Sequence, residues 1–478
     1  MSTDSTAPVA ASAKSFLPWL VAVAFFMESL DTTILNTAVP TVAAALRVDP
    51  LGMKSALTSY TLSLAVFIPI SGWMADRFGT RHVFAAAIGI FTLGSLLCGL
   101  SNDIHTLVIS RVLQGGGGAM MLPVGRLTMV RTYPKSELIR AMGYVAIPGL
   151  IGPMLGPAVG GFIVEHLHWR MIFFVNVPIG LAGLYMVLRR LPDYRAERSH
   201  RMDFIGLVLF GAGISLLSYV LEIFGEHSLS EREMLGLLAL SLLLLAAYVR
   251  HALTADHPLL RLGLFGARTF RVAVGGSFLA RLGIAGMPFL LPLLYQIGLG
   301  YTPFQSGLLI MPQFVGAISM KFAQSRILAR FGYRRVLLWN TGAIGLLIMA
   351  FATVDPDTPV WRIVLQVLCF GFCASLQYTS MNTLAYADVP DPQVSMASTI
   401  ASTAQQLSMS FGVATASLVA AFFIPNRFSA DATQMIHGLH QGFVVLGLLT
   451  MVSASIFATL RGDDGVNVSR HKVGVPTG

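Results

Sequence analysis

Long runs of apolar residues constrain how this chain can fold more than any other feature of the sequence. A helix that crosses a bilayer needs about 20 apolar residues, and the 478-residue chain offers fourteen such runs. We therefore predict an all-α membrane protein with fourteen transmembrane helices. The predicted helices lie near 16–38, 55–75, 83–101, 106–128, 141–163, 171–190, 203–222, 233–250, 272–293, 303–323, 336–353, 361–385, 397–423 and 439–460.

The composition excludes the other broad classes of protein. Hydrophobic residues make up 55% of the chain and charged residues only 12%, against roughly 25% charged residues in a soluble domain. So much apolar surface excludes intrinsic disorder. So little charge could not cover the surface of a soluble enzyme of two or three domains. A protein that crosses the membrane many times remains.

The first apolar run is interpreted as a retained helix. It follows a polar leader, residues 1–15, and contains Glu28 and Asp31. No small-residue cleavage site precedes these two acids, as a removed signal peptide would require.

The distribution of Lys and Arg predicts the orientation in the membrane. Of the 32 Lys and Arg residues, 24 fall at the N-terminus and in the loops on its side of the membrane, and six fall in the opposite loops. Positively charged loops stay in the cytoplasm, so we predict that both termini are cytoplasmic. The loop near 386–396 departs from this rule, since it has no Lys or Arg. The net charge of +9 then reflects orientation, and we expect no nucleic-acid partner.

An internal repeat predicts the domain organisation. Residues 77–83 (RFGTRHV) recur as residues 330–336 (RFGYRRV), with five of seven positions identical. The spacing fits six helices, two extra helices and six more, and duplicated bundles are typical of secondary transporters. We predict a cytoplasmic leader, an N-terminal six-helix bundle, two extra linker helices, a C-terminal six-helix bundle and a cytoplasmic tail, at 1–15, 16–190, 191–271, 272–460 and 461–478.

The sequence lacks the motifs of ATP-driven transport and of common enzymes. No G-x-x-x-x-G-K-[ST], H-E-x-x-H or G-x-S-x-G pattern occurs. The glycine run 115–118 lies within a predicted helix, where close helix packing explains it better than phosphate binding. Cys98, Cys369 and Cys373 lie in apolar stretches without a zinc or disulfide spacing. A membrane-embedded enzyme is therefore disfavoured, and we expect neither a cofactor nor a metal.

Charges inside the predicted helices are the candidates for function, because a charge in hydrocarbon costs several kcal/mol unless it faces a cavity or a partner. Four such residues lie away from the ends of the predicted helices: Glu28 and Asp31 on helix 1, Arg111 on helix 4 and Arg281 on helix 9. At 1.5 Å per residue, Asp31 lies about 22 Å from one membrane face and Arg111 about 8 Å from the other. In a core about 30 Å thick these depths coincide, so the two can pair.

The positions of the other two charged residues, Glu28 and Arg281, also follow from helical geometry. Glu28 lies three residues before Asp31 on the same helix face, and two acids so placed disfavour simultaneous ionisation. A carboxyl group in such a pair could take up and release a proton, and proton coupling requires a group of this kind. Arg281 lies about 15 Å deep, near the midplane where transporter substrates bind. The alternative interpretation is a static ion pair that fixes helix packing.

Motifs along nearly the whole chain resemble those of the major facilitator superfamily, and specifically its fourteen-helix drug:proton antiporter subgroup of the EmrB/QacA type. Residues 30–40 (LDTTILNTAVP) are similar to the helix 1 motif, and residues 72–81 (GWMADRFGTR) to the loop motif after helix 2. Residues 111–115 (RVLQG) and 152–161 (GPMLGPAVGG) resemble the helix 4 motif and the helix 5 antiporter motif. Segments 169–178 and 295–300 extend the likeness to helices 6 and 9.

The resemblance implies roles for particular residues. Asp31 would be the protonatable site, with Glu28 and Arg111 as its proton-coupling partners. The loop after helix 2 would act as a cytoplasmic latch, and the helix 5 run would allow close approach and bending. The second loop copy has no Asp before Arg330, so we expect a weaker latch there. The gating set is Asp76, Arg77, Arg81, Gly152, Pro153, Gly156, Pro157, Gly160 and Gly161, and the substrate-binding set is Asn36, Gln114, Arg281, Tyr295 and Gln296.

The function expected from these residues is proton-driven export of small molecules by alternating access. The protein would lie in the lipid bilayer and use the proton motive force as its source of energy. A mostly apolar cavity with two acids favours lipophilic drugs and cations. The two arginines inside the membrane equally allow an exporter of organic anions such as carboxylate metabolites. The sequence does not identify a periplasmic adaptor protein.

Overall fold

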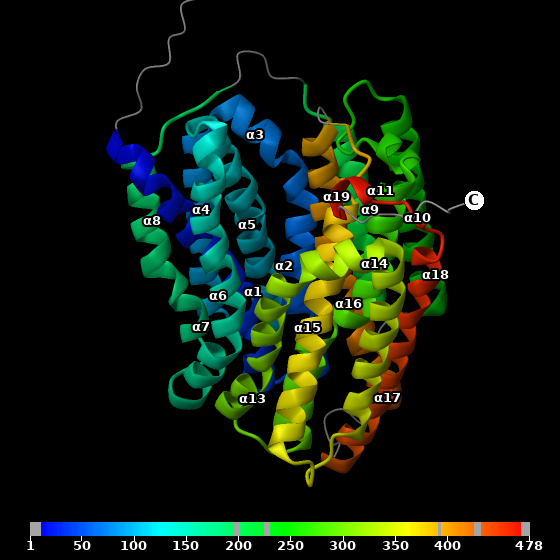
Figure 1. The fold of residues 1–478 in the computed structure, drawn as a ribbon. Helices are drawn as coiled ribbons and strands as arrows, with labels where there is room; N and C mark the ends of the chain where they lie inside the picture. Colours follow the sequence, from blue (N-terminus) through cyan, green and yellow to red (C-terminus); the bar gives the residue numbers. More distant parts are fainter. Residues whose placement is uncertain (1–10, 196–200, 224–229, 391–392, 425–431, 470–478) are drawn as a thin grey trace, which may run out of the picture.

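The computed structural model describes residues 11–195, 201–223, 230–390, 393–424 and 432–469, and these residues form helices and no strand (Figure 1). The all-α prediction is confirmed. Within the described residues, twelve helical stretches are long and apolar enough to cross a membrane. The predicted spans 303–323 and 336–353 fall in one continuous stretch, Pro303–Thr353, and the span 141–163 falls in a helix outside the twelve. The count of fourteen spans stays a prediction.

The N-terminal half, up to Arg190, packs its helices around α1. Here α1 contacts α5, α6 and α8, while α4 and α5 lie against each other. The aspartate Asp103 begins α5 by accepting a hydrogen bond from the N–H of Thr106 at 2.9 Å. The elements are α1 (Ala11–Leu46), η1 (Pro50–Met53), α2 (Lys54–Phe67), η2 (Ile68–Ile70), α3 (Ser71–Phe78), α4 (Thr80–Leu100), α5 (Ile104–Thr132), α6 (Lys135–His166), α7 (Met171–Phe174) and α8 (Asn176–Arg190).

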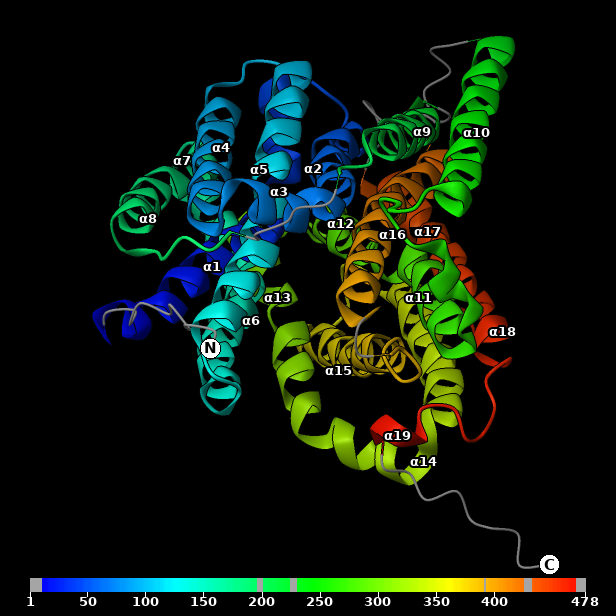
Figure 2. The same cartoon turned by 90° about the horizontal axis from the view of Figure 1, so that it is seen from above.

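The C-terminal half begins after two further helices at the edge of the molecule, of which α9 lies beside α2 and α16 and α10 lies against α9 (Figure 2). A capping box formed by Ser230 and Glu233 begins α10. The elements are α9 (Phe204–Ile223), α10 (Glu231–Thr254), η3 (Leu262–Gly266), α11 (Arg268–Ile284), α12 (Met287–Leu293), the π-helix η4 (Leu294–Gly298), α13 (Pro303–Ile310), α14 (Pro312–Ala350), η5 (Phe351–Thr353), α15 (Val360–Leu384), α16 (Val394–Phe423), α17 (Ala432–Val452), α18 (Ala454–Phe457) and α19 (Val466–Ser469).

The sequence repeat forms the same backbone feature in both halves. Gly79 stands between α3 and α4 with φ of 92°, and Gly332 bends α14 with φ of 71°. Only glycine adopts such angles without strain. The bend divides the 39-residue α14 into two limbs (Figure 2). The two copies of the repeat are therefore similar in backbone conformation as well as in sequence.

The start of α1, the α3–α4 turn and α19 lie at one face of the molecule, here called the termini face (Figure 1). Hydrogen bonds that join the two halves lie toward the opposite face. Gln296 Nε2 donates to the carbonyl of Thr37 at 2.8 Å, and Ser417 Oγ donates to the carbonyl of Leu51 at 3.0 Å. The N–H of Phe304 donates to Glu165 at 2.9 Å, and this bond lowers the pKa of that carboxyl group. The halves are thus joined away from the termini face.

Small residues let α6 and α13 approach closely across the boundary between the halves. A Cβ added at Gly307 would lie 2.3 Å from the carbonyl oxygen of Pro157, and one at Gly161 would lie 2.3 Å from that of Pro303. The backbones therefore pack directly against each other, as expected where small residues line a helix contact in a membrane.

We predict that Gly307→Ala lowers the midpoint of thermal unfolding of the purified protein, because overpacking a tight contact costs about 1–3 kcal/mol. Gly342→Ala is the matched control, since nothing lies within 4 Å of a Cβ added there. That control should leave the midpoint unchanged or raise it, because Ala is favoured over Gly in a helix by about 1 kcal/mol. Equal midpoints for the two variants would contradict the tight α6–α13 contact.

Candidate functional site

A buried ion pair between α1 and α5 lies at the centre of the N-terminal half. Arg111 Nη1 donates to Asp31 Oδ2 at 2.5 Å, and both residues are only 1% exposed. The predicted pairing of these residues is confirmed. Both side chains project from regular helices at the same level, as the rise per residue along each helix predicts.

Two amides hold the second oxygen of Asp31. Gln114 Nε2 donates to Asp31 Oδ1 at 2.8 Å and Asn176 Nδ2 donates to it at 2.9 Å. Gln114 follows Arg111 by one helical turn, so the R-x-x-Q motif presents both side chains to the same carboxylate. Gln114 also bonds Ser95 Oγ at 2.7 Å. Gln114, which was predicted to bind substrate, thus belongs to the hydrogen-bond network around Asp31.

The guanidinium of Arg111 is also enclosed on its other sides. Its Nε donates to the carbonyl of Ala56 at 3.2 Å, and its Cζ lies 4.2 Å from the centroid of the Tyr60 ring. The Phe173 ring centroid is 6.0 Å away. A buried charge needs such partners, since removing one member of a buried pair leaves the other uncompensated at a cost of about 3–5 kcal/mol. Protonating Asp31 would have the same electrostatic consequence for Arg111.

A cavity of about 470 Å³ separates the two halves near the middle of the molecule. Its N-terminal wall is formed by α1 and α6, and its C-terminal wall by residues of α11 to α16. Such a volume suits a small organic molecule. The polar or charged residues that line it are Glu28, Ser29, Thr32, Thr33, Asn36, Gln313, Lys321, Ser375, Tyr378, Gln405 and Gln406.

Glu28 and Asp31 face different surroundings although they lie one turn apart. Glu28 lines the cavity, whereas Asp31 is enclosed within the bundle. The Oε2 atom of Glu28 is buried and has no hydrogen-bond partner in the described part of the chain. A carboxylate oxygen left in this way at a cavity wall can accept a donor from a ligand.

Arg281 is buried behind the opposite wall. It is 4% exposed, bonds the hydroxyl of Ser277 and lies 4.7 Å from the centroid of the Tyr378 ring. Its Nη2 also donates to Gln405 Oε1 at 3.4 Å. Tyr378 and Gln405 line the cavity, so Arg281 lies directly behind the surface that a ligand would touch. Within the described residues it has no acidic partner.

Lys321 also lines the cavity from α14, and its ammonium donates to Thr379 Oγ1 at 2.8 Å. The count of charges in the sequence assigned this residue to a cytoplasmic loop, whereas the structure places it within α14. The helix continues past it to the bend at Gly332, so Lys321 points into the space between the halves. A hydropathy profile cannot distinguish a residue in a solvent-exposed loop from one that lines a cavity inside the protein.

The remaining residues of the predicted substrate set differ in position. Asn36 lines the cavity. Gln296 joins the two halves through Thr37, and Tyr295 is fully buried beside it in the π-helix η4. The structure therefore brings Asn36 and the neighbours of Arg281 to the cavity and places Tyr295 and Gln296 at the joint between the halves.

The predicted latch residue Asp76 forms an ion pair with a residue of the neighbouring helix. Arg131 Nη2 on α5 donates to Asp76 Oδ1 at 2.6 Å. Arg77 is exposed and Arg81 is half-buried at the start of α4. Both members of the pair are partly exposed, and such a pair contributes about 0–1 kcal/mol. It can therefore break without unfolding the helices.

The segment after α8 also holds this loop in place, and the sequence analysis did not predict this contact. Asp193 Oδ1 accepts the N–H of Arg81 at 3.1 Å and so caps α4, and a Cβ at Gly79 would lie 2.3 Å from that oxygen. Thr80 and Tyr194 also exchange two hydrogen bonds of 3.0 Å. No motif marks Asp193, because its partner lies over 100 residues away.

The second copy of the loop motif lacks this arrangement. Ala329 stands where the first copy has Asp76, and Arg330, Arg334 and Arg335 form no ion pair with any described residue. This agrees with the weaker latch predicted there.

The glycines of the predicted gating run on α6 lie against α1. A Cβ at Gly152 would meet Ser29, one at Gly156 would meet Thr33, and one at Gly160 would lie 2.2 Å from the carbonyl oxygen of Ile34. Gly161 faces α13 as described above. Pro153 and Pro157 line the cavity, and the carbonyl of Pro157 accepts the hydroxyl of Thr37 at 2.9 Å. The run thus lies at the contact of α1, α6 and the cavity.

Comparison with known proteins gives a consistent result. A sequence model of the Major Facilitator Superfamily matches residues 21–413. The chain is 39% identical over 449 residues to a Serratia proteamaculans protein, covering 94% of each chain, and 40% identical over 457 residues to one from Cronobacter sakazakii, covering 95% and 97%. Both are named "Putative multidrug resistance protein MdtD". Among solved structures, a bacterial homolog of the human lysosomal transporter Spinster is similar in fold, with a TM-score of 0.66, 13% identity and coverage of 98% and 100%.

The buried pair can be tested by a double-mutant cycle. We predict that Asp31→Asn and Arg111→Met each lower the free energy of unfolding, with Arg111→Met costing about 3–5 kcal/mol because it leaves an uncompensated carboxylate. The double variant should lose less than the sum of the two, measured by denaturant unfolding in detergent. Strictly additive losses would show that the charges do not stabilise each other.

Proposed function

The chain belongs to the Major Facilitator Superfamily, and from this premise we propose that it exports small molecules in exchange for protons by alternating access. It is a multi-pass membrane transporter related to multidrug resistance proteins, and it is not an enzyme. The proton coupling, the substrate class and the direction of transport are the proposed part.

The observation that carries the proton coupling is the enclosed Asp31 carboxylate with Arg111 as its only cationic partner in the described residues. Protonation of Asp31 removes the charge that compensates Arg111, which favours rearrangement of α1 against α5. In this mechanism proton binding and helix movement are coupled because neither charge can remain buried alone. The energy source is the proton motive force.

Lipophilic drugs and cations are the proposed substrates. The cavity wall presents the unpartnered Oε2 of Glu28, which can accept a hydrogen bond from an amine or pair with a cation. Aromatic and apolar residues such as Phe25, Phe314 and Phe370 complete the wall and suit the apolar body of such a molecule. The names of the relatives agree with this substrate class.

An organic anion, such as a carboxylate metabolite, is the alternative substrate. Lys321 lines the opposite wall, and Arg281 lies behind Tyr378 without an acidic partner in the described residues. This alternative rests on the excess of positive charge at the C-terminal wall.

The proposed orientation places the termini face in the cytoplasm of a bacterial cell, within the inner membrane, as the Lys and Arg distribution predicts. The two halves would then be joined toward the periplasm. The pair Asp76–Arg131 and the α4 cap at Asp193 would form the cytoplasmic latch, and the α6 run would permit the bend between states.

We predict that Asp31→Asn abolishes substrate-driven proton flux in proteoliposomes while the protein remains folded, because Asn keeps the shape of Asp but cannot take up a proton. Asp103→Asn is the matched control, since Asp103 is an exposed helix cap and Asn caps a helix about as well as Asp. The control should retain the flux. Full antiport by Asp31→Asn would overturn the proton-coupling proposal.

A second pair of variants separates the two substrate classes. We predict that Glu28→Gln raises the KM for a cationic dye about tenfold, since a hydrogen bond to a charged group contributes about 1.5–3 kcal/mol, while the exposed control Glu231→Gln leaves it unchanged. Dye transport should survive in Arg281→Ala. If dye transport is unaffected by Glu28→Gln and carboxylate transport is lost in Arg281→Ala, the organic-anion alternative is correct.

A further inference from the structure

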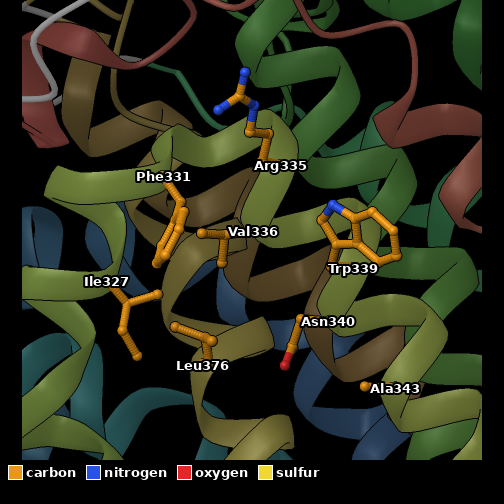
Figure 3. Close-up of a pocket in the computed structure, with 8 residues that line it drawn as sticks. All are labelled: Ile327, Phe331, Arg335, Val336, Trp339, Asn340, Ala343 and Leu376. Carbon is orange, nitrogen blue, oxygen red and sulfur yellow. The ribbon is translucent and has the colours of Figure 1, made fainter.

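A second hollow, distinct from the cavity between the halves, lies between α14 and α15 of the C-terminal half (Figure 3). It has a volume of about 410 Å³ and lies where α14 bends at Gly332, with Leu376 of α15 as its floor. We call it the α14 groove. Its lining residues are Ile327, Phe331, Arg335, Val336, Trp339, Asn340, Ala343 and Leu376.

Most residues that line the α14 groove are apolar, and two of them are well exposed. Trp339 is 81% exposed and Phe331 is 47% exposed. Val336, Trp339 and Ala343 follow the spacing of one helix face, which gives an apolar track along the second limb of α14. In a protein that crosses the membrane, such a surface meets lipid chains.

The end of the groove toward the bend is strongly basic. Arg335 lies at this end of the groove (Figure 3). Arg326, Arg330 and Arg334 are exposed on the same part of α14, and none of the four arginines forms an ion pair with a described residue. The nearby acid Asp464 is engaged by Arg268. The groove therefore combines an apolar track with an uncompensated positive end.

We propose that the α14 groove binds one anionic phospholipid of the surrounding leaflet. Arg335 would hold the phosphate, and an acyl chain would lie along Val336, Trp339 and Ala343. Arginine binds phosphate through paired N–H donors, and basic pockets between membrane helices suit anionic head groups. The apolar track favours a lipid over free phosphate, because a free ion would leave that track unused.

The difference between the two copies of the repeat supports this assignment. In the first copy Asp76 pairs with Arg131, and Asp193 caps the following helix. In the second copy Ala329 replaces the acid, and the arginines after the bend stay available. The same backbone turn thus serves a protein contact in one half and a lipid contact in the other.

Quenching of Trp339 fluorescence tests the proposal on the full-length protein in nanodiscs. The probes are phosphatidylglycerol and phosphatidylcholine with brominated acyl chains, each diluted into unlabelled phosphatidylcholine. We expect brominated phosphatidylglycerol to bind at least fivefold better than brominated phosphatidylcholine, and the Trp339→Phe variant to lose the difference in quenching. Inorganic phosphate at millimolar concentration should not reverse the quenching.

The charge at the groove is tested by three variants. Arg335→Gln should reduce the preference for phosphatidylglycerol to near onefold, and Arg335→Lys should restore most of it. Arg189→Gln, which removes an exposed arginine from α8 in the other half, should leave it unchanged. The proposal is overturned if the wild type binds both lipids equally, if Arg335→Gln and Arg189→Gln behave alike, or if inorganic phosphate displaces the lipid.

Discussion

The ion pair between Asp31 and Arg111 is the interaction on which the rest of the N-terminal half depends. Two charges are enclosed within the bundle, and α1, α2, α5 and α8 supply the groups that compensate them, while Ser95 of α4 accepts a hydrogen bond from Gln114. Because no member of the set can lose its partner cheaply, the five helices are held in one arrangement while Asp31 is charged. A change of its protonation state therefore acts on the whole half and not on a single side chain.

The two halves share a duplicated plan but differ in where their charges lie. The N-terminal half encloses its central ion pair and presents the acid Glu28 to the cavity. The C-terminal half has no corresponding acid in its described core, and it presents Lys321 to the cavity with Arg281 behind the wall. The asymmetry continues at the two glycine bends, where one copy carries an acid and the other does not. The acid Glu28 on one wall and the basic group Lys321 on the other give the cavity a distinct polarity.

Much of the fold and part of the site could be predicted from the sequence. Apolar runs located the helices, and the level of Asp31 and Arg111 followed from helical rise, since regular geometry converts residue number into depth. The partners Asn176 and Asp193 could not be predicted, because their contacts depend on how distant helices are rotated against each other. Lys321 shows the same limit, since counting charges by loop cannot tell solvent from the wall of an internal cavity. Gln114 was placed on the right helix, whereas Tyr295 lies in η4, just past the predicted span 272–293, and the direction of both side chains depends on packing.

By itself, the sequence determined that this chain is an all-helical membrane protein with a duplicated motif and a few charges inside its apolar runs. The physical reason is that the bilayer acts on each segment separately, through its length and its hydrophobicity. Only the tertiary structure decided which charges are enclosed and which face the cavity, where the two halves are joined, and where the α14 groove is left open. Those outcomes depend on close contacts between residues far apart in the chain, and such contacts follow from the packing of all the helices together.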